Sequence, residues 1–221
     1  ALAASMAGPV AYRAGLGTAQ RQFEWLDRSG RKLGEVGSKD SAIPLNPSLS
    51  PDGRRLAYQR TVDGNRDVWM LEIARGILSR FTFDAANDGF PIWSPDGRRI
   101  VFQSGRKGHF DFYQKPASGD GAEEPLLETN QSKNPQDWSP DGRFLLYQIS
   151  NNGIWALPFD GDRKPIPLTR TAFRDTKGQF SPDGKWLAYE SDQSGRSEIY
   201  IQPFPGPGGK TQISTNGGAQ V

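Results

Sequence analysis

Short apolar segments recur along this 221-residue chain, separated by polar stretches rich in Gly, Pro, Asp and Asn. Tyr, Phe, Val, Ile and Leu dominate the segments, which are the residue types that favour strands. No stretch keeps apolar residues at the i, i+3, i+4, i+7 spacing of an amphipathic helix. The pattern therefore predicts an all-β fold, with strands over residues 55–59, 99–103, 144–148 and 186–190.

A Ser-Pro-Asp-Gly tetrapeptide precedes each of these strands. It occupies residues 50–53, 94–97, 139–142 and 181–184, at spacings of 44, 45 and 42 residues. Pro at the second position of a turn presets φ near −65°, and Gly accepts the positive φ that returns the chain. Each tetrapeptide is therefore predicted to be a hairpin turn. We expect its Asp to bond to nearby backbone amides and not to act chemically.

A second pattern follows each hairpin. A Gly is followed three residues later by an acid and then by an aromatic, as in Gly64, Asp67 and Trp69, and the copy at Gly153 lacks the acid. The pattern predicts a third strand, and fourth strands follow over residues 78–83, 125–129, 165–169 and 211–215. We expect the recurring aromatics in the core: Trp69, Tyr113, Trp155 and Tyr200.

Four antiparallel strands in about 43 residues make one blade of a β-propeller. A weaker copy, with Ser5–Gly8 in place of the turn, precedes the four clear ones. The chain is thus predicted to be one domain, residues 1–221, of five consecutive four-stranded blades. The predicted units are residues 1–40, 41–84, 85–129, 130–170 and 171–215, with residues 216–221 starting a further innermost strand.

Two arrangements of five blades are open. The last residues could pair with the first unit and close a five-bladed ring, which is the interpretation we prefer. Alternatively, the five blades form an arc of a larger propeller with six to eight blades. A closed ring predicts a monomer, whereas an open arc would expose strand edges and favour self-association.

The composition argues against several classes of function. Lys and Arg number 27 against 25 Asp and Glu, so the net charge is +2 and gives no basis for binding nucleic acid or an anionic membrane. The chain has no Cys, which excludes disulfides and thiolate chemistry. A single His, His109, argues against a multi-histidine metal centre. We expect neither nucleic acid nor membrane contact by this segment.

The repeated unit resembles the TolB-like Pro-Asp β-propeller repeat, a relative of WD-repeat blades. The resemblance rests on the aromatic-Ser-Pro-Asp-Gly turn, the strand behind it and the Gly-x-x-acid-x-aromatic pattern, and it covers essentially the whole chain. Residues 159–165 and 200–210 look most like propellers C-terminal to bacterial Ser/Thr kinases, although no kinase motif is present. The repeat also resembles the propeller that gates prolyl-oligopeptidase-type hydrolases. The resemblance implies a bacterial, periplasmic sensor or interaction module.

Two functions remain. The first is a non-catalytic module that binds a protein or peptide or senses a ligand. The second is a small esterase or lactonase that uses a metal-bound water in the central channel, as in calcium-dependent lactonase propellers. No Gly-x-Ser-x-Gly motif supports a serine hydrolase. Because Ca²⁺ prefers oxygen ligands, the channel candidates are the following polar residues at the start of innermost strands: Asp88, Asn134 and Asp175, with Asn46.

We favour the binding module, with no cofactor. Repeat proteins bind partners through unlike loops at one end of a repeated scaffold, and here those loops lie opposite the uniform turns. They join the second and third strands or connect one unit to the next, and they include residues 61–66, 104–110, 151–153, 170–177 and 191–197. The candidate rim residues are Arg66, His109 and Arg196. We expect His109 to be an exposed loop residue, like Asn65 and Arg196 at the matching positions.

Overall fold

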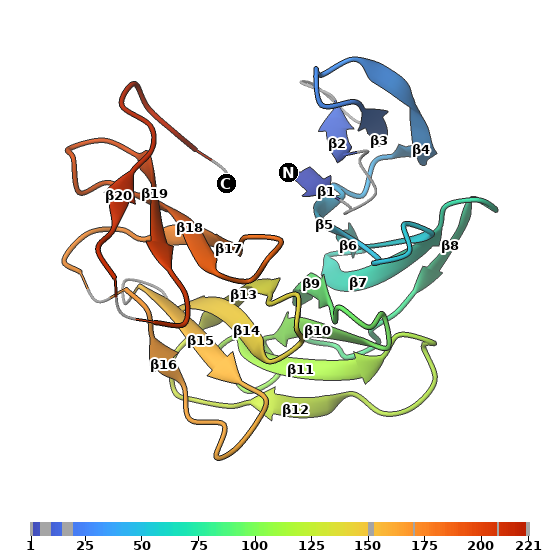
Figure 1. The fold of residues 1–221 in the computed structure, drawn as a ribbon. Coiled ribbons are helices and arrows are strands. Elements are labelled where there is room, and N and C mark those ends of the chain that lie inside the picture. The colour runs from blue at the N-terminus through green and yellow to red at the C-terminus, as the bar shows by residue number, and fades with distance from the viewer. Residues whose placement is uncertain are drawn as a thin grey trace. The chain divides into compact units, whose positions relative to one another are not determined.

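The computed structural model describes residues 2–4, 10–14, 20–149, 153–169, 171–206 and 208–219, the first two ranges by their backbone alone. The described residues form strands, turns and loops, with no helix among them. They fall into two compact units, residues 1–129 and 130–221. Each unit is built of four-stranded antiparallel sheets of the kind that forms a propeller blade (Figure 1).

The first unit contains three sheets, and within each one the strands pair in chain order. The first sheet consists of β1 (Leu2–Ala4), β2 (Val10–Ala14), β3 (Arg21–Leu26) and β4 (Lys32–Asp40). The second consists of β5 (Leu45–Leu49), β6 (Arg55–Val62), β7 (Asn65–Glu72) and β8 (Ile77–Arg80). The third consists of β9 (Asp88–Trp93), β10 (Arg99–Ser104), β11 (Asp111–Pro116) and β12 (Glu124–Leu127).

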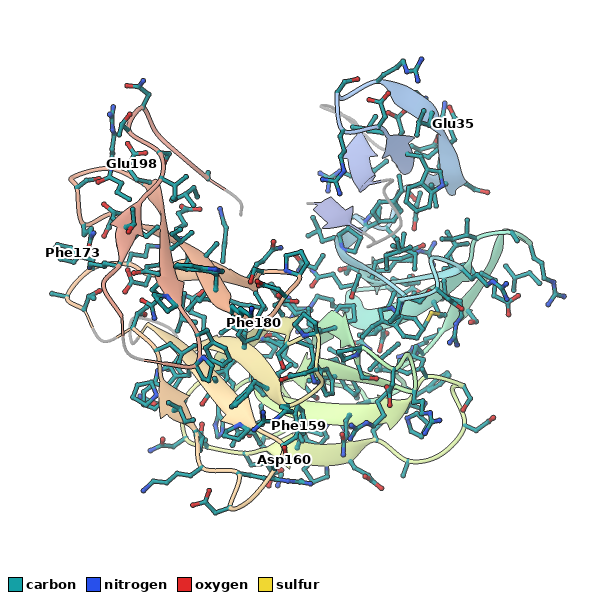
Figure 2. All side chains as sticks on the ribbon, viewed as in Figure 1. Glu35, Phe159, Asp160, Phe173, Phe180 and Glu198 are labelled. Carbon is teal, nitrogen blue, oxygen red and sulfur yellow. The ribbon has the colours of Figure 1, made fainter. Side chains whose placement is uncertain are left out.

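The second unit contains two sheets with the same strand order. One consists of β13 (Lys133–Trp138), β14 (Phe144–Ile149), β15 (Ile154–Pro158) and β16 (Ile166–Pro167). The other consists of β17 (Thr176–Phe180), β18 (Trp186–Ser191), β19 (Glu198–Pro203) and β20 (Thr211–Gln212). The two sheets share a core around Leu146 and Tyr189. At the edge of this core, the ring centres of Phe180, which Figure 2 labels, and Phe204 lie 4.7 Å apart.

The Ser-Pro-Asp-Gly hairpin turns are confirmed. In the turn at residues 94–97, Gly97 has a φ of 68° and its amide donates to the carbonyl oxygen of Ser94. The Ser94 hydroxyl donates to the Asp96 carboxylate over 2.5 Å, and the same carboxylate oxygen accepts the amide of Arg98. The other three turns repeat these bonds. These bonds hold the pKa of each turn Asp below its usual value, as expected for a structural carboxylate.

The first strand of each of the last four sheets carries a bulge. In β9, Gly89 pairs with Gln103 and Ile92 with Val101, so two residues of β9 stand opposite one of β10. Phe90, inside this bulge, has a φ of 51°, which is unusual for a residue with a side chain. The bulges in the other sheets begin at Asn46, Gln136 and Lys177.

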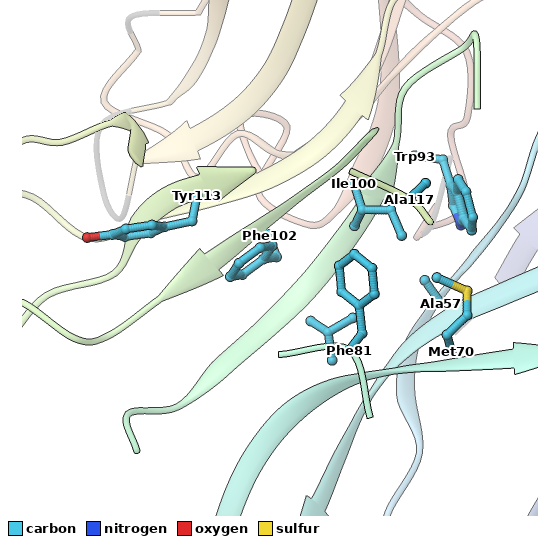
Figure 3. Packing of buried hydrophobic residues seen from close by; sticks show 9 residues of the cluster. Ala57, Met70, Phe81, Trp93, Ile100, Phe102, Tyr113 and Ala117 are labelled. Carbon is cyan, nitrogen blue, oxygen red and sulfur yellow. The ribbon is translucent and has the colours of Figure 1, made fainter. Parts of the chain in front are cut away.

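The core of the first unit lies between neighbouring sheets. Met70 of the second sheet and Trp93 and Phe102 of the third belong to one buried cluster, which Figure 3 shows from close by. A second cluster, which includes Phe23 and Tyr58, lies between the first and second sheets. Each sheet therefore buries large apolar side chains against the next sheet of the unit, which is how propeller blades are stabilised.

Three expectations need correction. The fourth strands are shorter than predicted, because hydroxyls beyond their ends, such as that of Thr82, bond to the third strand instead. Only two of the recurring aromatics, Tyr113 and Tyr200, are fully buried, whereas Trp69 and Trp155 are partly exposed. Residues 216–219 form no strand, because the amides of Gly217 and Gly218 donate to residues 198 and 197. Residues 5–8, 151, 152, 170, 220 and 221, which also figured in the predictions, lie outside the described residues.

Candidate functional site

Three loops of the first unit meet around Asn87, at the end of the sheets opposite the hairpin turns. The Asn87 side-chain oxygen accepts the amide of Arg66, at the start of β7, over 3.1 Å. Its carbonyl oxygen accepts the amide of Gly105, in the loop after β10, over 3.0 Å. The Asn65 side chain donates to the carbonyl oxygen of Asp84, in the segment before β9. These bonds fix three loops of unlike sequence against one another.

Asp88 lies beneath this junction, at the first position of β9, and is fully buried. No donor among the described residues meets hydrogen-bond geometry with either carboxylate oxygen. The nearest cation is Arg106, whose Nη2 is 3.6 Å from Asp88 Oδ2. Burial raises the pKa of Asp88 to about 6, and the nearby Ser104 hydroxyl and the charge of Arg106 oppose the shift only in part. Asp88 is therefore a carboxyl group that can change charge near neutral pH.

Arg106 is held in place by several groups at once. Its Nε donates to the Ser104 hydroxyl over 2.7 Å, and its Nη2 donates to Glu123 over 2.6 Å. Its guanidinium carbon lies 4.1 Å from the centre of the Tyr113 ring, and Asp84 is 3.7 Å from its Nε. A charge fixed in this way needs little reorganisation to act on a nearby group.

Arg66 has the opposite character. Its Nε and Nη2 are buried and form no hydrogen bond with a described residue. Its guanidinium lies over the ring of Phe110 at 5.3 Å, and burial lowers its pKa while Asp88 opposes the shift. The Oε1 atom of Gln103, on β10, is likewise buried and unpaired among the described residues. We refer to Arg66, Asp88, Gln103 and Arg106 as the Asp88 cluster.

Gly89 brings the parts of this cluster close together. A Cβ at this position would lie 2.7 Å from Gln59 Oε1 and 3.3 Å from Arg66 Nε, so a side chain would force both groups to move. The absence of a side chain lets Arg66 approach the β9 backbone beside Asp88. The cluster thus presents buried, unpaired donors on Arg66 and buried acceptors on Asp88 and Gln103, which suits a ligand group with both an acceptor and a donor.

His109 was expected to be an exposed loop residue, but it is only partly exposed and contacts an acid. Its side chain is 33% exposed, and its Nε2 lies 3.2 Å from the buried carboxylate of Asp111. The matching residues contact the acid two positions later in the same way: Asn65 Nδ2 donates to Asp67 over 3.2 Å, and Arg196 Nε donates to Glu198 over 2.7 Å. His109 and Arg196 therefore hold the recurring acid at the start of the third strand.

The recurring acid in turn anchors the end of the fourth strand. Asp111 accepts the amide of Thr129 over 2.9 Å, and Glu198 accepts the Ser214 hydroxyl and the Gly217 amide. These bonds lower the pKa of Glu198. The copy that lacks the acid keeps part of the arrangement, since the Thr169 hydroxyl accepts the amide of Ile154 over 2.9 Å. The acid thus links the start of the third strand to the end of the fourth.

Two of the three remaining candidates, Asn134 and Asp175, lie in the second unit. Asn134 is on β13 opposite Gln148, and Asp175 is buried just before β17. Asp175 accepts the Thr171 hydroxyl over 2.7 Å through Oδ2, while its Oδ1 has no partner among the described residues. In the first unit, Asn46 donates to Gln59 over 2.8 Å. Within the described residues, no three His, Cys, Asp or Glu side chains gather where they could hold a metal ion.

Sequence reasoning identified Arg66 and Asp88 but missed Gln103 and Arg106. A signal for Gln103 was available, because the fifth residue of each second-strand segment that follows a Ser-Pro-Asp-Gly turn is Gln or Glu: Gln59, Gln103, Gln148 and Glu190. In three sheets this residue bonds to the bulge residue of the first strand, as in Lys177 Nζ to Glu190 Oε2 over 2.8 Å. In the third sheet the bulge residue is Phe90, which offers no side-chain hydrogen bond, so Gln103 Oε1 is left unpaired.

Comparison with solved structures shows the same fold. TolB from Acinetobacter baumannii matches with a TM-score of 0.83 at 21% identity, over 99% of this chain and 55% of that protein, so the chain spans about half of its length. A TolB-like structure from Agrobacterium tumefaciens matches with a TM-score of 0.75 at 21% identity, over 93% of this chain and 76% of that one. An oligogalacturonate lyase from Vibrio parahaemolyticus matches with a TM-score of 0.64 at 13% identity, over 92% and 65%.

These structures include an enzyme, so the shared fold does not by itself decide the function. The described part of the chain contains no helix long and apolar enough to cross a membrane. No curated protein matches the sequence. The family model of the TolB beta propeller domain matches residues 29–163, more than half of the chain. The chain therefore belongs to the TolB β-propeller domain family.

Proposed function

We propose that this chain is a non-catalytic interaction module that binds a protein or peptide at the loop end of its sheets. The observation that carries the proposal is the Asp88 cluster, where buried donors and acceptors from separate strands and loops lack partners. An unpaired buried polar group costs about 1–3 kcal/mol. A partner that supplies the missing hydrogen bonds would recover part of that cost on binding.

The chemistry of the cluster suits a peptide group or a carboxamide side chain. Such a group has a carbonyl oxygen for the Arg66 fork and an N–H for Asp88 or Gln103. Because the Phe110 ring stacks over the Arg66 guanidinium, the partner would reach it by displacing that ring. The loops around Asn87 are already held by hydrogen bonds, so little loop ordering would oppose binding.

A peptide-display selection tests this proposal. Peptides that bind the immobilised chain are selected, and their affinities are measured for the wild type, Arg66→Met and Arg54→Met. Arg54 is an exposed residue of a hairpin turn at the other end of the sheets and serves as the matched control. We expect Arg66→Met to weaken binding by tenfold or more and Arg54→Met to leave it unchanged.

Two results would contradict the proposal. One is a set of peptides whose affinity depends on Arg54 and not on Arg66. The other is hydrolysis of an ester or lactone panel that requires added Ca²⁺ and stops with a chelator, which would favour the hydrolase alternative. We also propose a periplasmic location, which family membership supports and which fractionation of bacteria expressing the full-length gene product would test.

A further inference from the structure

A cavity of about 150 Å³ lies between the first and second sheets of the first unit, away from the Asp88 cluster. Its apolar lining includes Phe23, Val36, Tyr58 and Leu71, all nearly or fully buried. The rings of Phe23 and Tyr58 meet edge to face at 5.0 Å, which gives the cavity an aromatic wall. A cavity of this volume accepts a molecule the size of benzene. We refer to this cavity as the Tyr58 pocket.

The polar part of the lining is predominantly cationic. Arg21, Lys39 and Arg60 line the pocket with a single acid, Asp40. Arg60 is already paired with Asp40 through two hydrogen bonds, of 2.6 and 3.1 Å, and stacks on the Trp69 ring at 4.6 Å. Among the described residues, Arg21 and Lys39 have no acid within salt-bridge distance, although the charge of Lys39 acts at longer range on Glu35. The pocket therefore has two cationic side chains available for an anion.

Tyr58, which lines the pocket, also carries a hydroxyl group. Its side chain is 4% exposed, and its hydroxyl forms no hydrogen bond with a described residue. Burial, with the charge of Asp40, raises the pKa of Tyr58, so its hydroxyl stays protonated and can donate a hydrogen bond at any physiological pH. The hydroxyl can therefore donate to an acceptor on a molecule that enters the pocket.

We propose that the Tyr58 pocket binds a small aromatic carboxylate, with the ring against Phe23 and Tyr58 and the carboxylate toward Arg21 and Lys39. The volume admits one ring, and the wall of the pocket is aromatic. The positive charges of Arg21 and Lys39 favour an anion over a neutral molecule of the same shape. This site is separate from the proposed peptide-binding end of the sheets, and neither proposal depends on the other.

Benzoate and benzamide are the probes, because they share a ring and differ in charge. Both are titrated into the ¹⁵N-labelled wild-type chain, and amide shifts are followed by NMR. We expect saturable binding of benzoate in the millimolar range or tighter, with shifts at residues 23, 36 and 58, and binding of benzamide weaker by tenfold or more. Equal binding of the two probes, or no saturable shift with benzoate, would overturn the proposal without any variant.

Variants then locate the anion. The double variant Arg21→Gln, Lys39→Gln removes both rim charges at positions that are half-buried and exposed, and Arg28→Gln removes an exposed cation that does not line the pocket. We expect the double variant to weaken benzoate binding by tenfold or more, Tyr58→Phe to weaken it several-fold, and Arg28→Gln to leave it unchanged. Unchanged benzoate binding by the double variant would refute the role of the cationic rim. A free aromatic acid and a peptide ending in Phe share this chemistry. The affinity for N-acetyl-phenylalanine, compared with the affinity for benzoate, distinguishes these two sources.

Discussion

Replacing Asp88 by Asn should make the stability of this protein less sensitive to pH. The pKa of Asp88 rises from 3.8 to about 6 in the folded chain, chiefly because the carboxyl is buried. An acid with a raised folded pKa binds its proton more tightly when folded, so its contribution to stability falls as pH rises from the unfolded to the folded pKa. Roughly two pKa units at about 1.4 kcal/mol each amount to a penalty of about 3 kcal/mol at pH 7.5.

Urea denaturation of wild type and Asp88→Asn at pH 4 and pH 7.5 measures this penalty. The free energy of unfolding of the variant minus that of the wild type should be more positive at pH 7.5 than at pH 4, by about 2–3 kcal/mol. Asp96→Asn is the control, and its effect on the free energy of unfolding should change with pH in the opposite direction. Hydrogen bonds from Ser94 and Arg98 lower the pKa of that turn acid. A carbon-13 titration that gave Asp88 a pKa near 4 would refute the reasoning.

Three further predictions concern backbone geometry and the recurring acid. Gly97→Val should cost about 1–2 kcal/mol in thermal unfolding because its φ is 68°, whereas Gly34→Val, at an open position without positive φ, should cost clearly less. Gly178→Ala should cost about 1–3 kcal/mol in urea unfolding, since its Cβ would lie 2.8 Å from Leu146 Cδ2; an unchanged midpoint would contradict the packing. Glu198→Gln should destabilise more at pH 7 than at pH 3, because the lowered pKa of Glu198 favours the folded state only when it is ionised; equal losses in urea at both pH values would contradict this.

The repeat made the sheets predictable, because each feature that fixes them is local. The turn at residues 94–97 needs only Pro, Asp and Gly in order, and its hydrogen bonds lie within six residues. The end of a fourth strand was not predictable in this way. Thr82 has strand propensity, but its hydroxyl accepts the amide of Val68, 14 residues earlier, so the strand stops at Arg80.

The candidate site was predictable only in part for a related reason. Arg66 was identified because the loops vary between units, and Asp88 because polar residues that could bind Ca²⁺ recur at the start of innermost strands. The burial of Asp88 and the lack of a partner for Gln103 could not be predicted. Both depend on the bulge at Phe90 and on the close approach of Arg66 to Gly89. The Tyr58 pocket depends on the packing of two sheets whose sequences give no sign of a gap.

The strand order within each sheet keeps the contacts of this chain local in sequence. Every strand in the five sheets pairs only with strands adjacent in sequence, so each sheet is a series of hairpins. Closing a short loop costs less chain entropy than bringing distant segments together, and folding rates rise as contacts become more local. Because ribosomes add about 5–20 residues per second, a sheet of about 43 residues emerges within roughly two to nine seconds. One sheet can therefore complete its pairing while the next is still being synthesised, which limits the time that unpaired edges are exposed to aggregation.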